Sequence, residues 1–243
     1  DNQHPTGTAL IFVADSGENC IAVAPGANYS LSPESINHFS KVIDETEIVV
    51  MQAEIPYNTI KSIALLAQQK GKKVLFNPAP ACLIDAELMK AIDILVVNEV
   101  EAAFVSGIKH TGDNLEEIAE ALITAGAQNV VITLGSHGVY MKNAYTSGRL
   151  PSYKVNAIDT IAAGDTFCGA LAVMCAQKEI DIEALKFANA AAAIAVTRSG
   201  AQPSIPTLEE VNHFILKNEL PYRSTSKFNE HENLLEPTIH SIR

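Results

Sequence analysis

The sequence is poor in basic residues. Of its 243 residues, 17 are Lys or Arg and 28 are Asp or Glu, so the formal net charge at pH 7 is −11. A chain with this balance lacks the basic surface that attracts phosphate backbones or anionic lipid headgroups. We therefore expect neither nucleic acid nor a membrane as a partner. An anionic substrate would have to be bound by a local site, because the overall charge of the protein would not attract it.

Long apolar runs and paired cysteines are also missing. No apolar run approaches the roughly 20 residues that a membrane-spanning helix needs, and the sequence as given does not open with a signal peptide. The four cysteines (Cys20, Cys82, Cys168 and Cys175) show no CxxC spacing, and the seven histidines are scattered, so no zinc motif is present. We expect reduced, buried thiols and a cytoplasmic protein.

Apolar residues make up 47% of the chain, which is enough for a sizeable core. Short apolar runs alternate with helical stretches, and this alternation predicts βαβ units and a three-layer α/β/α fold with a mostly parallel sheet. The expected strands are 48–51, 73–76, 94–97, 129–133, 139–142 and 152–158. The expected helices are 32–42, 57–70, 85–91, 101–105, 115–126, 182–198 and 207–217, with one more from the end of the 159–167 segment to about 178.

Three parts of the chain differ in pattern. Residues 1–28 contain two short β-like runs, 8–14 and 19–25, around a Gly-containing turn, which predicts a hairpin. Residues 29–219 carry the alternating strands and helices. Residues 220–243 are polar, and we expect a disordered or loosely docked tail.

The most informative segment is Asp159–Phe167, with the sequence DTIAAGDTF. A β-branched run, Tyr153–Ile158, precedes it and an apolar run, Cys168–Ala176, follows it, which predicts a strand, a turn of small residues and a helix. Ala162, Ala163 and Gly164 leave the backbone open to a ligand, and the first N–H groups of the following helix form an anion site. Asp165 is placed to take a proton from a hydroxyl group beside that site. Alternatively, Asp165 only caps the helix.

Polar residues follow the other expected strands as well. In an open parallel sheet the strands end at a common edge, where ligands bind, so these residues should meet in one site. The clusters are Gln52–Glu54, Asn77, Asn98–Glu101, Gly135–Gly138 and Asp159–Asp165.

Three of these clusters have a second interpretation. Asn98 and Glu101 lie one helical turn apart and suit either a hard cation or a helix start. Glu54 suits a sugar hydroxyl or simply the solvated surface. The segment Gly135–Gly138 could hold phosphate or form a plain turn.

The DTIAAGDTF segment resembles the C-terminal signature of the ribokinase family, the phosphofructokinase-B-type sugar kinases. The segments Thr133–Gly138 and Asn189–Ser204 extend the resemblance, which covers roughly residues 6–218. It implies ATP-dependent phosphorylation of D-ribose to D-ribose 5-phosphate. Another sugar or nucleoside kinase of the family and a truncated, noncatalytic nucleotide-binding fragment remain alternatives. A Rossmann NAD-binding protein does not fit, because no GxGxxG follows an early strand.

The resemblance also implies roles for individual residues. Asp165 would be the general base and contact the sugar together with Glu54, and Ala162, Ala163 and Gly164 would form the anion hole. The ATP-binding residues would be Asn98, Thr133, Leu134, Gly135, Ser136, His137, Gly138, Gly164, Asp165 and Asn189. From the residues alone, His137 is given no chemical role.

Two cations are implied by the same resemblance. Mg²⁺ would bind Glu101 through water. An activating K⁺ would lie between two loops, held by Asp159, Ile161, Ala195, Arg198, Gly200 and Ser204. Carbonyl-rich coordination of this kind suits potassium better than magnesium. For Arg198 the alternative is a basic residue at a helix end.

The resemblance is incomplete at both ends. The family's early Gly-Gly sugar motif and first sugar-binding Asp are absent from the sequence as given, which begins in mid-pattern. We therefore expect the N-terminal part of such a kinase to be missing. The hairpin in residues 1–28 would be the remnant of a β lid over the sugar and would pair with a second subunit in a homodimer. Residues 220–243 have no counterpart in the family.

Overall fold

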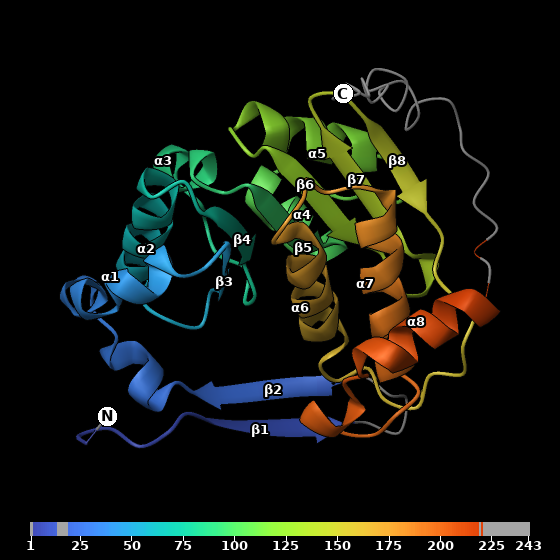
Figure 1. Ribbon diagram of the computed structural model, residues 1–243, viewed down its shortest axis with the longest axis horizontal. Helices are drawn as coiled ribbons and strands as arrows, with labels where there is room; N and C mark the ends of the chain where they lie inside the picture. Colours follow the sequence, from blue (N-terminus) through green and yellow to red (C-terminus); the bar gives the residue numbers. More distant parts are fainter. Residues whose placement is uncertain (1, 14–18, 219, 221–243) are drawn as a thin grey trace, which may run out of the picture.

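A six-stranded sheet forms the centre of the protein in the computed structural model, which describes residues 2–13, 19–218 and 220. The strands lie side by side in chain order, as Figure 1 shows. They are β3 (Ile48–Gln52), β4 (Lys73–Asn77), β5 (Ile94–Asn98), β6 (Asn129–Thr133), β7 (Val139–Asn143) and β8 (Ser147–Leu150). The strands from β3 to β6 are parallel, whereas β7 and β8 are antiparallel to their neighbours.

The sheet is covered on both faces because its central strands are apolar throughout. Side chains alternate between the faces along a strand, so Leu95 and Val97 of β5 join one core, while Ile94 and Val96 join the other. The first core is covered by α2 (Tyr57–Gln69), α3 (Ala86–Lys90), α4 (Glu99–Ser106) and α5 (Leu115–Thr124), the second by α6 (Ala163–Cys175) and α7 (Ile182–Ala195). The predicted three-layer α/β/α fold is confirmed.

Two further helices complete the layers. Helix α1 (Ile36–Asp44) packs beside α2, and α8 (Leu208–Lys217) packs against α7. Short 3-10 turns span Gly26–Ser30, Pro33–Ser35, Gly135–His137 and Gln202–Ser204. None of the helices in the described part of the chain has the length and apolar character of a membrane span.

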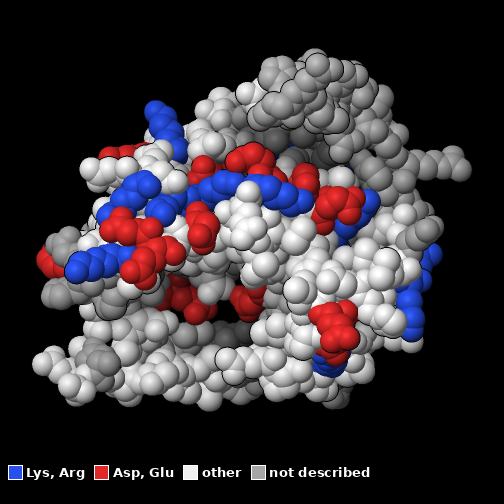
Figure 2. Space-filling model, in the orientation of Figure 1, with Lys and Arg blue, Asp and Glu red and all other residues white. Residues whose placement is uncertain are grey.

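The predicted hairpin forms a separate two-stranded sheet of β1 (Thr8–Val13) and β2 (Asn19–Ala24). The turn at residues 15–18 lies outside the described residues. Both strands lack charged residues, and Leu10, Phe12 and Val23 are exposed. The hairpin runs below the main body in Figure 1, and Figure 2 shows a hollow between the two with acidic side chains at its rim.

The expected strand at residues 152–158 is wrong, because the partner of β7 is β8, which begins at Ser147. The reason is a tight turn: Asn143 Oδ1 accepts hydrogen bonds from the N–H groups of Tyr145 and Thr146. After β8 the chain leaves the sheet. The N–H groups of Ile158 and Asp159 donate to the carbonyl of Val196, at 2.7 and 3.2 Å, so the segment is tied to the end of α7 instead.

Two helices end earlier than predicted. Helix α6 ends at Cys175 rather than near Lys178. Lys73 Nζ donates hydrogen bonds to the carbonyls of Cys175 and Lys178, at 3.1 and 2.7 Å. Helix α7 stops at Ala195 rather than Arg198, because the chain tightens into i to i−3 hydrogen bonds and reaches Gly200 with φ +88°. Apart from Leu220, which packs against the core, residues 220–243 lie outside the described residues.

Candidate active site

The carboxyl ends of the parallel strands bring polar side chains to one edge of the sheet. In the strand register Gln52 lies opposite Asn77, and Asn98 lies opposite Thr133. These four residues end β3, β4, β5 and β6 in order. Helix α6 begins beside this edge, since Gln52 contacts Asp165 directly. Gln52, Asn77, Asn98, Thr133 and Asp165 therefore lie at one edge of the sheet, as the sequence predicted for the clusters to which they belong.

Helix α6 opens on a residue with an unusual backbone. Ala162, the N-cap, has φ 59°, and its carbonyl accepts hydrogen bonds from both the N–H and the Oγ1 of Thr166, at 2.9 and 2.8 Å. The N–H of Ala163 donates to the carbonyl of Thr160 at 3.3 Å. The N–H groups of Gly164 and Asp165 come too early in the helix to reach a carbonyl within it. They are therefore free to bind an anion.

Asp165 is not the helix cap. It is the third residue of α6, in the first turn, and its carboxylate does not cap the N-terminus. Its Oδ1 accepts a hydrogen bond from Gln52 Nε2 at 2.6 Å, while Oδ2 has no hydrogen-bond partner among the described residues. The capping alternative for Asp165 is therefore wrong, and one carboxylate oxygen stays open to a ligand.

A small polar cavity of about 160 Å³ lies between α6 and the strand ends. None of its lining residues is basic. They are Asn77, Ala79, Val96, Val97, Asn98, Glu101, Thr133, Ala162, Gly164, Asp165 and Cys168. The Cys168 thiol is held neutral, because burial and the nearby carboxylates raise its pKa to about 12.

Asn98 and Glu101 form the helix start that was one of the two interpretations of the sequence. They form a capping box at the start of α4: Asn98 Oδ1 accepts from the Glu101 N–H and Glu101 Oε2 accepts from the Asn98 N–H, both at 2.8 Å. Both also line the small cavity. Burial raises the pKa of Glu101, although hydrogen bonds from Asn98 and Asn77 oppose this. A partly desolvated carboxylate without a basic neighbour in its cavity fits a cation.

A larger cavity of about 450 Å³ adjoins the first, and Gly164 lines both. Its walls are mainly apolar. They comprise Thr133, Gly135, Ser136, Gly138, Ser152, Tyr153, Lys154, Val155, Ala157, Thr160, Ala163, Gly164, Phe167, Asn189, Ala192, Ala193 and Val196. Asn189 is 6% exposed and its Nδ2 donates to the Pro151 carbonyl at 2.8 Å. Shape and apolarity suit a flat ring, with glycine backbone at one end for a charged group.

The segment before α6 is bound to the loop after α7. Asp159 Oδ2 accepts from the Gly200 N–H at 3.0 Å and Oδ1 from the Ile161 N–H at 2.9 Å. These two bonds, Gly200 first, lower the pKa of Asp159, so the carboxylate stays ionised. Ser204 is fully buried, and its Oγ donates to the Ala201 carbonyl at 2.6 Å. One carboxylate and several carbonyls on two joined loops fit a monovalent cation.

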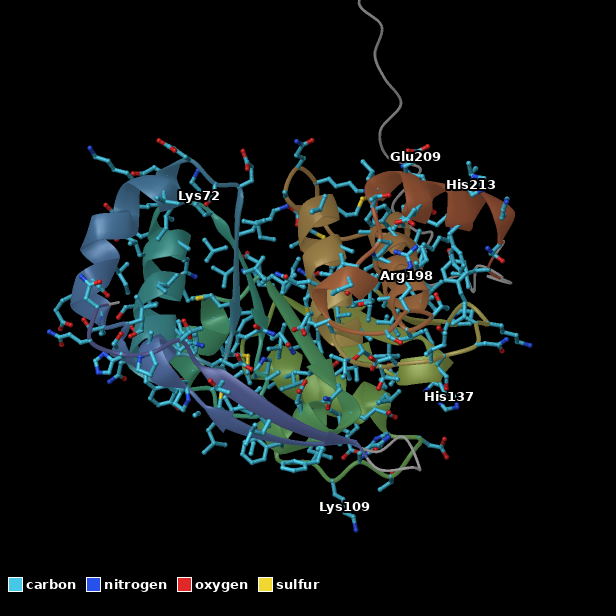
Figure 3. All side chains as sticks on the ribbon, turned by 90° about the horizontal axis from the view of Figure 1, so that it is seen from below. Lys72, Lys109, His137, Arg198, Glu209 and His213 are labelled. Carbon is cyan, nitrogen blue, oxygen red and sulfur yellow. The ribbon has the colours of Figure 1, made fainter. Side chains whose placement is uncertain are left out.

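Several predicted site residues lie away from both cavities. Glu54 is exposed and lines neither. Leu134 is packed in the core, and His137 is exposed at the periphery of the molecule (Figure 3). The Arg198 guanidinium binds Glu210 of α8 at 2.6 Å and lowers the pKa of that carboxyl to about 2. Arg198 is half-buried, and Figure 3 shows it among the helices of the C-terminal part of the chain.

Sequence reasoning assigned no role to Gln52, Asn77 or Cys168, although the first two belong to polar clusters that it singled out. Their position as the last residues of β3 and β4 was the available signal. The apolar walls of the larger cavity, such as Tyr153 and Val196, carried no signal, because such residues are indistinguishable in sequence from ordinary core positions.

Comparison with known proteins identifies relatives along most of the chain. The model of the pfkB family of carbohydrate kinases matches residues 1–208. A ribokinase of Staphylococcus aureus is 41% identical over 209 residues, which are 85% of this chain and 69% of the relative. A deoxyribokinase of Salmonella typhi is 34% identical over 217 residues, which are 88% of this chain and 71% of the relative.

Solved structures agree with these relatives. The crystal structure of a ribokinase from Thermotoga maritima is similar with a TM-score of 0.78 and 41% identity, covering 88% of this chain and 71% of that one. The structure of an Arabidopsis thaliana ribokinase complexed with ribose and ATP has a TM-score of 0.79 and 28% identity, covering 88% of this chain and 70% of that one.

Proposed function

The chain belongs to the pfkB family of carbohydrate kinases, and we propose that it transfers the γ-phosphoryl group of ATP to D-ribose, giving D-ribose 5-phosphate. The ribokinase relatives and the ribose and ATP complex of one of them support this substrate pair. The observation that carries the proposal lies in this chain itself. The open carboxylate oxygen of Asp165 lies beside the open N–H groups that begin α6, where the two cavities meet.

Asp165 Oδ2 would accept the proton of the primary hydroxyl of the sugar. The sugar oxygen forms a bond to the γ-phosphorus as the bond from that phosphorus to ADP breaks. The proton stays on Asp165, and ADP leaves with the electron pair. The N–H groups of Gly164 and Asp165 would hold the charge on the transferring group. Such a site acts mainly through positioning and electrostatics.

The larger cavity would take the nucleotide. The base would lie among the apolar side chains of α7 and residues 153–155, next to Asn189. The phosphates would extend past Gly135, Ser136 and Gly138 toward α6. Gly138 cannot be replaced easily, because a Cβ there would come within 2.0 Å of the Leu150 carbonyl. Leu134 and His137 line no part of this cavity, so we assign them no contact with ATP.

Two cations fit residues of the site. Glu101 would hold Mg²⁺ through water, and this ion would neutralise phosphate charge. K⁺ would bind between the two joined loops, at Asp159 and the carbonyls of Ile161, Ala195, Arg198 and Gly200, with Ser204. There it would fix the backbone that begins α6. Phosphoryl transfer that is equally fast in K⁺ and Li⁺ would exclude the potassium site.

The hairpin would close over the sugar and join two subunits. Its strands carry no charge, and Leu10, Phe12 and Val23 expose apolar surface. Glu54, which follows β3, would contact the sugar from the main body. A cytoplasmic location agrees with the free thiols of Cys82, Cys168 and Cys175. Cell fractionation that finds the protein in an oxidising compartment would refute this location.

A different sugar is the second candidate, because a deoxyribokinase is 34% identical to this chain. The two sugars differ in the 2-hydroxyl group. A comparison of kcat/KM for ribose, 2-deoxyribose and other pentoses decides between them. A preference for 2-deoxyribose would replace ribose as the substrate without changing the role of Asp165.

The substitution Asp165→Asn tests the mechanism. Loss of a general base lowers kcat by about 10²–10⁴-fold. The amide keeps the size of the side chain, and the anion-binding groups are backbone N–H, so the melting temperature and the affinity for ADP should stay near wild type. Stopped-time assays of ribose phosphorylation, thermal melting and calorimetric titration with ADP measure the three quantities. A kcat that falls by less than about tenfold would exclude Asp165 as the base.

A further inference from the structure

The hydrogen bond between Gln52 and Asp165 joins residues that are 113 positions apart in the sequence. Gln52 ends β3 and Asp165 lies in the first turn of α6, so the bond crosses from the sheet to the helix layer. Gln52 is partly buried, whereas Asp165 is exposed toward the site. The 2.6 Å distance between Nε2 and Oδ1 is short for an amide donor, as expected with a charged acceptor.

We propose that Gln52 is a positioning residue, which orients the Asp165 carboxylate so that Oδ2 faces the sugar hydroxyl. This inference rests on the proposed function. The amide of Gln52 can donate to a carboxylate but cannot exchange a proton with it near neutral pH. It therefore fixes the rotation of the carboxyl group without competing for the proton. The bond also leaves Oδ2 free to accept a proton, which a base requires.

Gln52 binds the Asp165 carboxylate, whereas the side chains that line the small cavity do not. The other titratable side chains that line the small cavity are Glu101 from α4 and Cys168 from α6, and no Lys, Arg or His lines it. Neither Glu101 nor Cys168 makes a hydrogen bond to Asp165. Within the described part of the chain, Gln52 is thus the only side chain that holds this carboxylate in place.

The alternative is that Gln52 only fastens β3 to α6. The chain contains a matched control for that role, because Gln128 Nε2 donates to Asp93 Oδ1 at 3.0 Å in a pair of the same chemistry. Asp93 and Gln128 precede β5 and β6, so this pair lies at the opposite edge of the sheet, far from the site. If the Gln52 bond is purely structural, its removal should change kcat no more than removal of the Gln128 bond does.

The first test compares Gln52→Leu with Gln128→Leu. A misdirected base should lower kcat by about 10- to 100-fold in Gln52→Leu, with ADP affinity within about twofold of wild type because the backbone anion site is untouched. Gln128→Leu should leave kcat unchanged while losing a similar amount of stability. Equal kcat values in the two variants at equal stability would overturn the proposal.

The second test uses Gln52→Glu, which places a second carboxylate beside Asp165. Two adjacent carboxylates share a proton, so the acid limb of the pH profile of kcat/KM should move up by about one unit or more. Carbon-13 NMR of the Asp165 carboxyl, assigned with Asp165→Asn, reports the same change without turnover. Its titration midpoint should rise in Gln52→Glu, rise less in Gln52→Leu, and stay constant in Gln128→Leu.

The two readouts separate this inference from the proposed function. If the wild-type chain phosphorylates no sugar, the proposed function fails, yet the NMR titration still decides whether Gln52 acts on the carboxylate. If the kinase is active and the titration midpoint is the same in all three variants, the role of Gln52 is wrong and the proposed function stands.

Discussion

At the scale of single residues, Gly164 is exposed and, like Thr133, lines both cavities. A Cβ at this position would meet no protein atom within 4 Å. Packing therefore does not require a glycine here. The absence of a side chain leaves space that a ligand can occupy. That space lies next to the N–H groups proposed to hold the transferring phosphoryl group.

The substitution Gly164→Ala should separate folding from function. Alanine favours a helix by up to ~1 kcal/mol over glycine, so the melting temperature should stay equal or rise. The added methyl group occupies the space of the ligand, and ADP affinity should fall at least about tenfold, equivalent to ~1.4 kcal/mol. Gly169→Ala is the control, because Gly169 lies in the same helix, has equal free space and lines neither cavity. Equal ADP affinity in both variants would contradict the anion site.

Single residues were also the most predictable part of the site. The DTIAAGDTF segment placed Asp165 and Gly164 together because neighbours in sequence stay neighbours in space. Asn98 and Glu101 were predictable for the same reason, at one helical turn. Gln52 was not, because its bond to Asp165 depends on the packing of β3 beside α6, which no local pattern encodes.

At the scale of elements, two helices start with the same capping device. Asn98 and Glu101 begin α4, and Thr207 and Glu210 begin α8. Only the first pair lines a cavity. Among the described α-helices, one capping box thus lies inside the site and one outside it.

The variants Asn98→Ala and Thr207→Ala should lose similar stability, about 1 kcal/mol each, since each removes an N-cap oxygen. Only Asn98→Ala should weaken the Mg²⁺-dependent binding of ADP, because only Asn98 holds Glu101 in the site. Urea unfolding measures the first effect and calorimetric titration with and without Mg²⁺ the second. If Asn98→Ala binds Mg²⁺ and ADP as Thr207→Ala does, Asn98 and Glu101 are a cap alone.

Elements with strong local signals were predicted well, and those set by long-range contacts were not. The capping box at Thr207 predicted the start of α8, and the apolar runs predicted the strands β3 to β6. Residues 152–158 have strand-like composition, yet they form no strand, because the turn at Asn143 pairs β7 with β8. The N–H of Ile158 bonds instead to the Val196 carbonyl, just after α7. Composition reports what a segment can form, whereas a strand also needs a free neighbour.

At the scale of the whole molecule, the two sheets differ in what covers them. The six-stranded sheet has helices on both faces, while the hairpin of β1 and β2 exposes Leu10 at 59%, Phe12 at 64% and Val23 at 56%. Leu10 and Phe12 lie on one face of the hairpin and Val23 on the other, as the strand register requires. Exposed apolar side chains that lie together, as Leu10 and Phe12 do, mark an interaction surface. The global pattern of alternating elements predicted the layers, but neither composition nor periodicity states which surface meets another subunit.

The substitution Phe12→Lys should therefore produce monomers, because a charge in the apolar surface opposes burial against a second copy. Sedimentation velocity at micromolar concentration measures the change. Leu216→Lys serves as the comparison, since Leu216 is 83% exposed but lies on α8, away from the hairpin. A wild-type protein that already sediments as a monomer would refute the dimer.

The hydrogen bond between Gln52 and Asp165 has a consequence for the response to heat. It joins two layers, since Gln52 ends β3 and Asp165 lies in α6, and parts of a protein open locally at a lower free energy than the molecule as a whole. Any local opening that separates the end of β3 from α6 would free Asp165 while the buried layers persist. Warming would then lower the activity before the protein melts, and cooling would restore it.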